Sequence, residues 1–172
     1  MRRIIIAFCL LGLPFISFGQ TINTNTSKIT FRISNLNLNT VKGTFQGFSG
    51  TVNFNPDDLA NSKFDVCVDA ASVNTENEKR DKHLRTEDFF EVETYPNICF
   101  KSTGITKTKE GFNTTGTLQM HGVEKEVEIP FSYSNNTLTG TLKLKRLDYG
   151  IGPSSGFMVG KTVNLEIVCV LN

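Results

Sequence analysis

Apolar and polar side chains alternate with a period of two along nearly the whole chain, and this pattern constrains the fold more than any other feature. Ile29, Phe31 and Ile33 are separated by polar residues, and Val127 and Ile129 repeat the pattern a hundred positions later. Successive side chains of a β-strand point to opposite faces, so each such segment predicts a strand with one apolar face. The segments lie near residues 27–38, 41–55, 62–73, 97–105, 112–121, 124–134, 137–147 and 162–171.

Within the first segment the alternation changes phase. It slips at Asn35, and Leu36 and Leu38 resume it on the even positions. A slip of one residue is what a β-bulge or a bend produces. The sequence therefore predicts an irregularity at Asn35.

Short turn signals separate most of these segments, at residues 55–58, 109–111, 121–122 and 135–136. Short connections favour antiparallel neighbours, because parallel strands need long crossovers. A sheet with one apolar face must cover that face, either by closing on itself or by stacking on a second sheet. We therefore predict an all-β fold, an eight-stranded antiparallel up-and-down barrel, with a two-sheet sandwich as the alternative.

The longest connection, residues 74–96, carries the one predicted helix, from Glu76 to Arg85. Thr75 and Glu78 have the spacing of a capping box. The connection ends in aromatic side chains, and Phe89 or Phe90 is expected to pack over one end of the barrel as a lid. Acid-to-base pairs four residues apart are expected to support the helix: Glu76–Arg80, Glu78–Lys82 and Asp81–Arg85.

The first nineteen residues have the layout of a secretory signal peptide. Arg2 and Arg3 precede an apolar run from Ile4 to Phe18, and small residues at Ser17 and Gly19 mark a cleavage site. Cleavage after Gly19 leaves 172 − 19 = 153 residues, a size that suits one domain over 20–172. No other segment is long and apolar enough to span a bilayer. We expect a protein that is exported to the periplasm or secreted, without stable membrane insertion.

The charge balance of the mature chain argues against two classes of partner. Without Arg2 and Arg3, 18 − 2 = 16 basic residues stand against 17 acidic ones. Nucleic-acid binding needs concentrated Lys and Arg, and anionic membranes attract polybasic segments. Neither partner is expected.

Three cysteines remain after cleavage: Cys67, Cys99 and Cys169. An odd number leaves at least one thiol unpaired within the chain. We interpret all three as buried small apolar side chains, with a Cys67–Cys99 bridge as the alternative.

No pattern of reactive residues predicts catalysis or metal binding. The chain has only two histidines, His83 and His121, without carboxylates or cysteines at ligand spacing, and His121-Gly122 is typical of a hairpin turn. Ser72 lacks the strand–turn–helix context of a nucleophile. Asp81 and His83 are two residues apart, which points them in different directions on a helix. The chain is expected to need no cofactor and not to be an enzyme.

Several motifs resemble those of one known family. The segment from Asp69 to Thr75, the run from Arg80 to Phe90 and the pair Tyr95-Pro96 resemble the hallmark of the YceI-like family. Residues 41–54, 100–103, 116–125 and 145–150 resemble its other conserved pieces. The resemblance covers essentially the whole mature chain, and it implies a lipocalin-like elongated barrel that binds a polyisoprenoid or a similar long-chain amphiphile. It also implies export and, often, pairing as a homodimer.

An eight-stranded barrel is either filled by its own side chains or holds one small ligand. The residues alone leave both alternatives open, the first being a plugged structural or interaction module. The resemblance implies the second, with a polyisoprenoid, an isoprenoid quinone or a fatty-acid derivative held for carriage or sequestration. Candidate ligand-binding residues are Phe31, Phe45, Phe54, Val66, Val68, Phe89, Phe90, Phe100, Leu118, Met120, Phe131, Leu142, Leu144, Leu165 and Ile167.

A polar or charged head at the barrel mouth would be contacted by Arg80, His83 and Arg85. An arginine fork suits phosphate geometry. The alternative is that both arginines serve only their helix partners. Arg146, Asp148 and Tyr149 are interpreted instead as residues that lock a loop.

Overall fold

The computed structural model describes residues 19–35, 39–154 and 159–172. Within these ranges nine strands form one antiparallel sheet, in the order β2-β1-β9-β8-β7-β6-β5-β4-β3. The strands are β1 Lys28–Asn35, β2 Asn39–Phe45, β3 Ser49–Asn53, β4 Lys63–Asp69, β5 Asn97–Lys107, β6 Phe112–Met120, β7 Val123–Ser134, β8 Thr137–Lys145 and β9 Val159–Val170.

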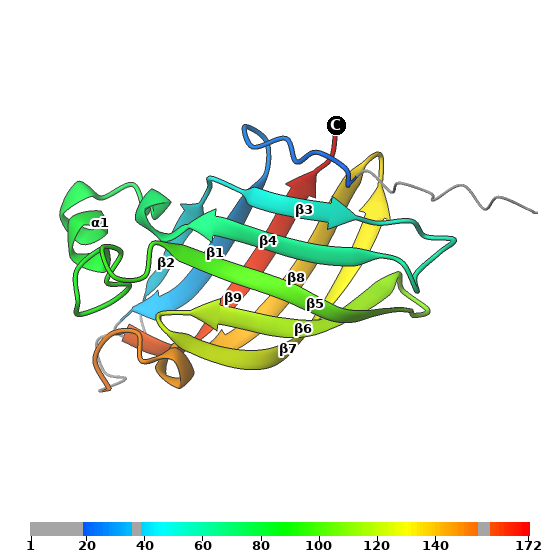
Figure 1. Cartoon of the computed structure of the whole chain (residues 1–172). Coiled ribbons are helices and arrows are strands. Elements are labelled where there is room, and N and C mark those ends of the chain that lie inside the picture. Colours follow the sequence, from blue (N-terminus) through cyan, green and yellow to red (C-terminus); the bar gives the residue numbers. More distant parts are fainter. Residues whose placement is uncertain (1–18, 36–38, 155–158) are drawn as a thin grey trace, which may run out of the picture.

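The sheet is curled, with β2 and β3 as its edge strands, and the strands that come first and last in the chain are neighbours within it. β1 pairs with β9 from Lys28↔Val168 onward, so the two ends of the mature segment lie together. Figure 1 shows β3 to β7 crossing in front of β1, β8 and β9, with the apolar faces enclosed between them. The predicted all-β antiparallel barrel is confirmed, and the stacked two-sheet alternative is wrong, because one continuous sheet surrounds the interior.

The strand count differs from the prediction at one place. The segment predicted as a single strand over 41–55 is divided into β2 and β3, which are not paired with each other. Gly47 has a φ of +72°, and the backbone of Gln46 leaves the ladder. The Gln46 carbonyl accepts from Asp69 N at 3.1 Å, and the Gln46 N–H donates to the Ser72 hydroxyl oxygen at 2.8 Å. The chain therefore pairs with β1 through β2 and then with β4 through β3. These two consecutive strands form the two edges of the curled sheet.

The phase slip in the first segment is confirmed. The pairing of β1 with β9 shifts register between Ile33 and Asn35. Leu36 and Leu38 lie outside the described residues, as does the predicted signal peptide over 1–18.

The helix in the 74–96 connection is shorter than predicted. α1 spans Glu78–Leu84, and its N-cap is Asn77, whose side chain accepts from Arg80 N. Glu76 has a φ of +60°, so it stands outside the helix and the predicted Thr75–Glu78 capping box is wrong. Thr75 instead donates from both its N–H and its hydroxyl to the buried carboxylate of Asp81.

None of the three predicted ion pairs on this helix forms among the described residues. The arginines are held by backbone oxygens instead. Arg80 donates to the hydroxyl and the carbonyl of Thr75, and Arg85 donates to the carbonyls of Ala71 and Val73. No helix within the described ranges is long and apolar enough to cross a membrane.

Two short 3₁₀ helices flank the same end of the barrel as α1. η1 (Ala70–Ser72) follows β4, and η2 (Arg146–Tyr149) follows β8. Figure 1 shows α1 and the loop after η2 at one end of the sheet, while the β5–β6 and β7–β8 turns lie at the other. These connections form the two ends of the enclosed space.

Two cysteines form a bridge that the sequence interpretation did not favour. Cys67 on β4 stands directly opposite Cys99 on β5, and their sulfur atoms are bonded. The interpretation of these two as isolated apolar side chains is therefore wrong, and the alternative is right. Cys169 is free and buried, as interpreted.

The pairing of β7 with β8 is incomplete. It runs only from Phe131↔Gly140 to Ser134↔Thr137, although β7 begins at Val123 and β8 ends at Lys145. The rest of the two strands, residues 123–130 and 141–145, diverge. Tyr149, 2% exposed, borders the surface hollow between them together with Val127 and Leu144.

Candidate functional site

The inward-facing side chains do not fill the barrel. They enclose a cavity of about 940 Å³, at the upper end of the range for small-molecule sites. Every strand of the sheet from β1 to β9 contributes at least one residue to its wall. The wall is predominantly aliphatic and aromatic, so the enclosed surface suits an apolar ligand.

The structure places the candidate interior residues on this wall with one exception. Phe54 is 4% exposed but lies behind the wall rather than on it. Alternation identifies which face a side chain occupies and carries no information on its depth along the barrel axis. The wall contains Phe31, Phe45, Val66, Val68, Phe89, Phe90, Phe100, Leu118, Met120, Phe131, Leu142, Leu144, Leu165 and Ile167.

Other wall residues were not among the candidates. Ile29, Ile33 and Val163 follow the same alternation, which could have identified them as inward-facing. Phe48 and Ile151 lie in connections, between β2 and β3 and after η2, where no periodic signal exists. Only the closed structure shows that these connections reach the interior.

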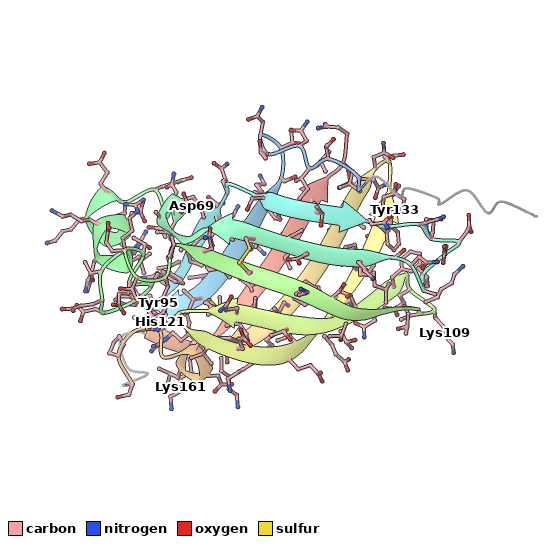
Figure 2. The ribbon with its side chains drawn as sticks, in the orientation of Figure 1. Asp69, Tyr95, Lys109, His121, Tyr133 and Lys161 are labelled. Atoms are coloured by element: carbon pink, nitrogen blue, oxygen red, sulfur yellow. A yellow bond between two sulfur atoms is a disulfide. The ribbon has the colours of Figure 1, made fainter. Side chains whose placement is uncertain are left out.

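An aromatic cluster closes the cavity at the end that carries the β7–β8 turn. Phe64 and Phe131 stand on the wall with ring centroids 5.6 Å apart. Phe54 lies behind them, 5.4 Å from Phe131 and 5.1 Å from Tyr133. Figure 2 shows Tyr133 at the end of the barrel away from α1. This end is a floor of aromatic rings that pack edge-on against one another.

The opposite end is polar and open. Ser34, Asn35, Arg80, His83 and Asp88 all reach the cavity wall there. The His83 and Asp88 side chains are 59% and 68% exposed and lie 3.1 Å apart, so this rim meets solvent.

The two lid candidates stand just inside this rim. The Phe90 ring packs edge-on against Phe45 at 5.3 Å, and the Phe89 ring packs against His83 at 5.1 Å. Both rings line the cavity beneath the 74–96 connection. Apolar side chains thus separate the rim from the deeper chamber.

The three candidate head-group residues do not share one environment. Arg80 and His83 reach the cavity wall, whereas Arg85 does not. Arg85 faces η1, where its Nε lies 2.7 Å from the carbonyl oxygen of Ala71. The helix turns the two arginines to different sides, and spacing alone did not distinguish them.

Arg146 is a wall residue that sequence reasoning placed in a loop-locking role. Its guanidinium donates to the carbonyl oxygens of Gly160, Ile151, Pro153 and Val159 at 2.6–3.1 Å, which confirms that role. It also reaches the cavity and is only 3% exposed. Burial lowers the pKa of this guanidinium from its usual value.

Two other buried groups have shifted acidities. Burial, and then the neighbouring charge of Asp148, raise the pKa of the Tyr149 phenol. Burial raises the pKa of the Cys169 thiol to about 11, although the Ser27 hydroxyl acts in the opposite direction. Both groups are therefore neutral at physiological pH.

His121 has a structural position outside the cavity. It forms the β6–β7 turn with Gly122, as predicted, and both have positive φ. Its Nδ1 lies 3.0 Å from the carbonyl oxygen of Tyr149, and its ring packs against Tyr95 at 4.9 Å. Figure 2 shows Tyr95 and His121 together at the α1 end. This contact fastens η2 to the sheet.

Within the described ranges no three His, Cys, Asp or Glu side chains gather in a way that would hold a metal ion. The cavity has an apolar interior, a polar rim and a floor closed by aromatic rings.

Comparison with known proteins identifies the family. The sequence model of the YceI-like domain matches residues 20–171. The chain belongs to the YceI-like family. A UPF0312 protein of Vibrio parahaemolyticus is 33% identical over 136 residues, which make up 73% of this chain and 72% of that relative. The chain spans between 52% and 74% of the length of the first curated relatives that it matches.

Solved structures share the YceI-like barrel. BcnA of Burkholderia cenocepacia superposes with a TM-score of 0.78 at 24% identity, covering 87% of this chain and 98% of that one. A polyisoprenoid binding domain from Saccharophagus degradans, described as implicated in plant cell wall breakdown, gives a TM-score of 0.64 at 18% identity, covering 86% and 94%. At these identities the likeness establishes the fold of the YceI-like domain.

Proposed function

We propose that this protein binds one long-chain amphiphile, such as a polyisoprenoid, an isoprenoid quinone or a fatty-acid derivative, inside its barrel and carries or sequesters it. The observation that carries the proposal is the cavity of about 940 Å³ with its apolar wall. Burial of an alkyl or isoprenoid tail contributes about 0.8 kcal/mol per methylene group before ordering costs. A tail of ordinary lipid length is thus held without any catalytic group.

The two ends of the cavity support one orientation of the ligand. The ring cluster around Phe54 offers no hydrogen-bonding group to the chamber, whereas the rim near Arg80 and His83 does. An amphiphile therefore binds with its tail toward Phe64 and Phe131 and its head toward α1. Contact of the ligand with the interior residues and with Arg80 is part of this proposal.

We infer further that the protein acts as a binding protein rather than an enzyme, and that it acts after export. The deep part of the chamber has mainly aliphatic and aromatic walls, and the titratable pair His83 and Asp88 lies at the exposed rim, away from a bound tail. The family match begins at residue 20, directly after the predicted signal peptide, and supports a mature domain over 20–172. Homodimer formation remains a prediction from the family resemblance.

Native mass spectrometry of the purified mature protein tests the proposal. We expect a mass increment that corresponds to one long-chain amphiphile per chain, and organic extraction should release it for identification. The same spectrum reports the oligomeric state. If the protein is bare and delipidated samples take up no isoprenoid alcohol, quinone or fatty acid in a saturable manner, the proposal is wrong and the cavity is structural.

A further inference from the structure

Arg146 is a buried cation at the wall of the cavity. It is 3% exposed, yet it belongs to the residues that line the chamber. It starts η2, which the His121–Tyr149 contact fastens to the β6–β7 turn. The guanidinium is therefore fixed in position before any ligand arrives.

Within the part of the chain that the structure describes, the hydrogen bonds of this guanidinium leave one donor unused. A guanidinium has five N–H groups. Nε donates to Gly160 O at 2.8 Å, Nη2 donates to Pro153 O at 2.8 Å and Val159 O at 3.1 Å, and Nη1 donates only to Ile151 O at 2.6 Å. The second N–H of Nη1 has no acceptor among the described residues.

The unused donor lies next to a glycine and to a lid residue. A Cβ atom at Gly152 would stand 3.1 Å from Arg146 Nη1 and 2.7 Å from the Phe89 ring. Gly152 also has a φ of +70°, which favours glycine. A side chain here would press on the Phe89 ring and on Nη1, so glycine lets the chain after η2 pack closely against both.

The charge of Arg146 has no acidic partner. No carboxylate of the described residues forms an ion pair with it. The stretches 1–18, 36–38 and 155–158 contain no Asp or Glu in the sequence, so they supply none either. Asp88 also lines the rim, but its side chain is 68% exposed and lies beside His83. Among the described residues, backbone carbonyls are the only groups that accept from the buried cation.

We propose that Arg146 recognises the head of the bound amphiphile, and that this head is an anion, a carboxylate or a phosphate, rather than a neutral alcohol or an amine. A buried charge without a counter-charge is unfavourable, and an anion beside it reduces that penalty. Charge-assisted bonds from a guanidinium are the strong class of hydrogen bond. An ammonium head would instead add a second cation to the same low-dielectric site. This inference rests on the proposed binding function and names its ligand class.

Three ligands that share one isoprenoid tail and differ only in the head group test this preference. Delipidated protein is titrated at neutral pH with geranylgeranoic acid, geranylgeraniol and geranylgeranylamine, and native mass spectrometry follows the complexes in direct competition. We expect the acid to bind on the order of tenfold more tightly than the amine, with the alcohol between them. Binding of none of the three would refute the proposed function itself. Equal binding of all three would overturn only the role of Arg146.

The substitution Arg146→Met removes the charge at similar length and should bring the ratio of acid to amine affinity close to one. Arg85→Met is the matched control, because Arg85 is likewise held by two backbone carbonyls but does not line the cavity. The control should keep the wild-type ratio. A preference for the acid that survives in Arg146→Met would overturn the assignment.

If Arg146→Met does not fold, a measurement on the wild-type protein still tests the assignment. Nitrogen-15 NMR of labelled arginine side chains gives one signal for Arg146, assigned by its loss in Arg146→Lys. We expect this signal to shift when geranylgeranoic acid binds and to move little with geranylgeraniol. A bound acid that leaves the Arg146 signal unchanged would show that the head lies elsewhere.

Discussion

Leu142 and Lys143 are neighbours on β8, but only Leu142 lines the cavity, whereas the Lys143 side chain belongs to the outer surface. Leu142→Trp should therefore fill part of the chamber and lower affinity for a long-chain ligand at least about tenfold, because the bulky ring occupies volume that a tail needs. Stability should change little, since an empty cavity accepts the added atoms. Lys143→Trp is the control. Titration of both variants with a fluorescent fatty acid checks this, and equal affinities would argue against binding in the chamber.

Cys169 makes stability depend on pH in the alkaline range. Its pKa rises from 9.0 in the unfolded chain to about 11 in the fold, mainly through burial. The unfolded state loses this proton first, so the stabilisation is complete below pH 9 and is lost as pH rises through about 11. The loss should reach about 3 kcal/mol, at about 1.4 kcal/mol for each unit of pKa. Urea unfolding of the wild type and of Cys169→Ala at a series of pH values from 8 upward measures the free energy of unfolding. If this free energy falls equally with pH in both proteins, the expectation is contradicted.

For single residues, the sequence predicts well which face of the sheet a side chain occupies, but it predicts poorly which residue on another strand it contacts. Alternation placed Leu142 and Phe131 inside correctly, because a strand side chain has only two directions. It also placed Phe54 inside but did not distinguish the floor from the wall. It did not bring Cys67 to Cys99, because pairing across strands depends on a register that the two separate segments do not specify.

At the scale of elements, the Cys67–Cys99 bridge ties β4 to β5 across the 74–96 connection. The bridge closes a loop of 32 residues, and such a constraint on the unfolded chain contributes about 3–4 kcal/mol in the loop-entropy account. Reduction, or the double substitution Cys67→Ser and Cys99→Ser, should lower the melting temperature clearly. Calorimetry with and without a reductant checks this. A reductant should leave the Ser–Ser variant unchanged, and any further loss would point to a different cause.

Elements were predicted where local pattern decides them and missed where distant contacts decide them. The β6–β7 turn at His121-Gly122 needs only local backbone freedom, and it formed as predicted. The helix began later than predicted because Glu76 has a φ of +60° and Asn77 caps the helix in place of Thr75, which the Asp81 carboxylate holds. The division of 41–55 required contacts from Asp69 and Ser72, which the segment itself does not contain.

At the scale of the whole molecule, the cavity links ligand binding to the stability of the barrel. A ligand that binds only the folded state adds about 2.7 kcal/mol at a hundredfold excess over its dissociation constant. We expect delipidated protein to melt at a lower temperature than protein purified with its ligand, and added long-chain amphiphile to restore the difference. Differential scanning fluorimetry with an extrinsic dye suits this chain, which has no tryptophan. A short-chain analogue of the same head should restore far less.

The incomplete pairing of β7 with β8 has a consequence for the motions of the barrel. Over residues 123–130 and 141–145 the two strands share no ladder, and Leu144 borders both the chamber and the outer hollow beside Tyr149. Local opening costs least where few hydrogen bonds break. Amide deuterium uptake should therefore be faster in 141–145 than in the paired segment 137–140 of the same strand. Local separation of β7 and β8 here would let solvent reach the bound tail through the side of the barrel and not only through the rim. A bound ligand fills the space behind Leu144, so it should slow deuterium uptake in this segment.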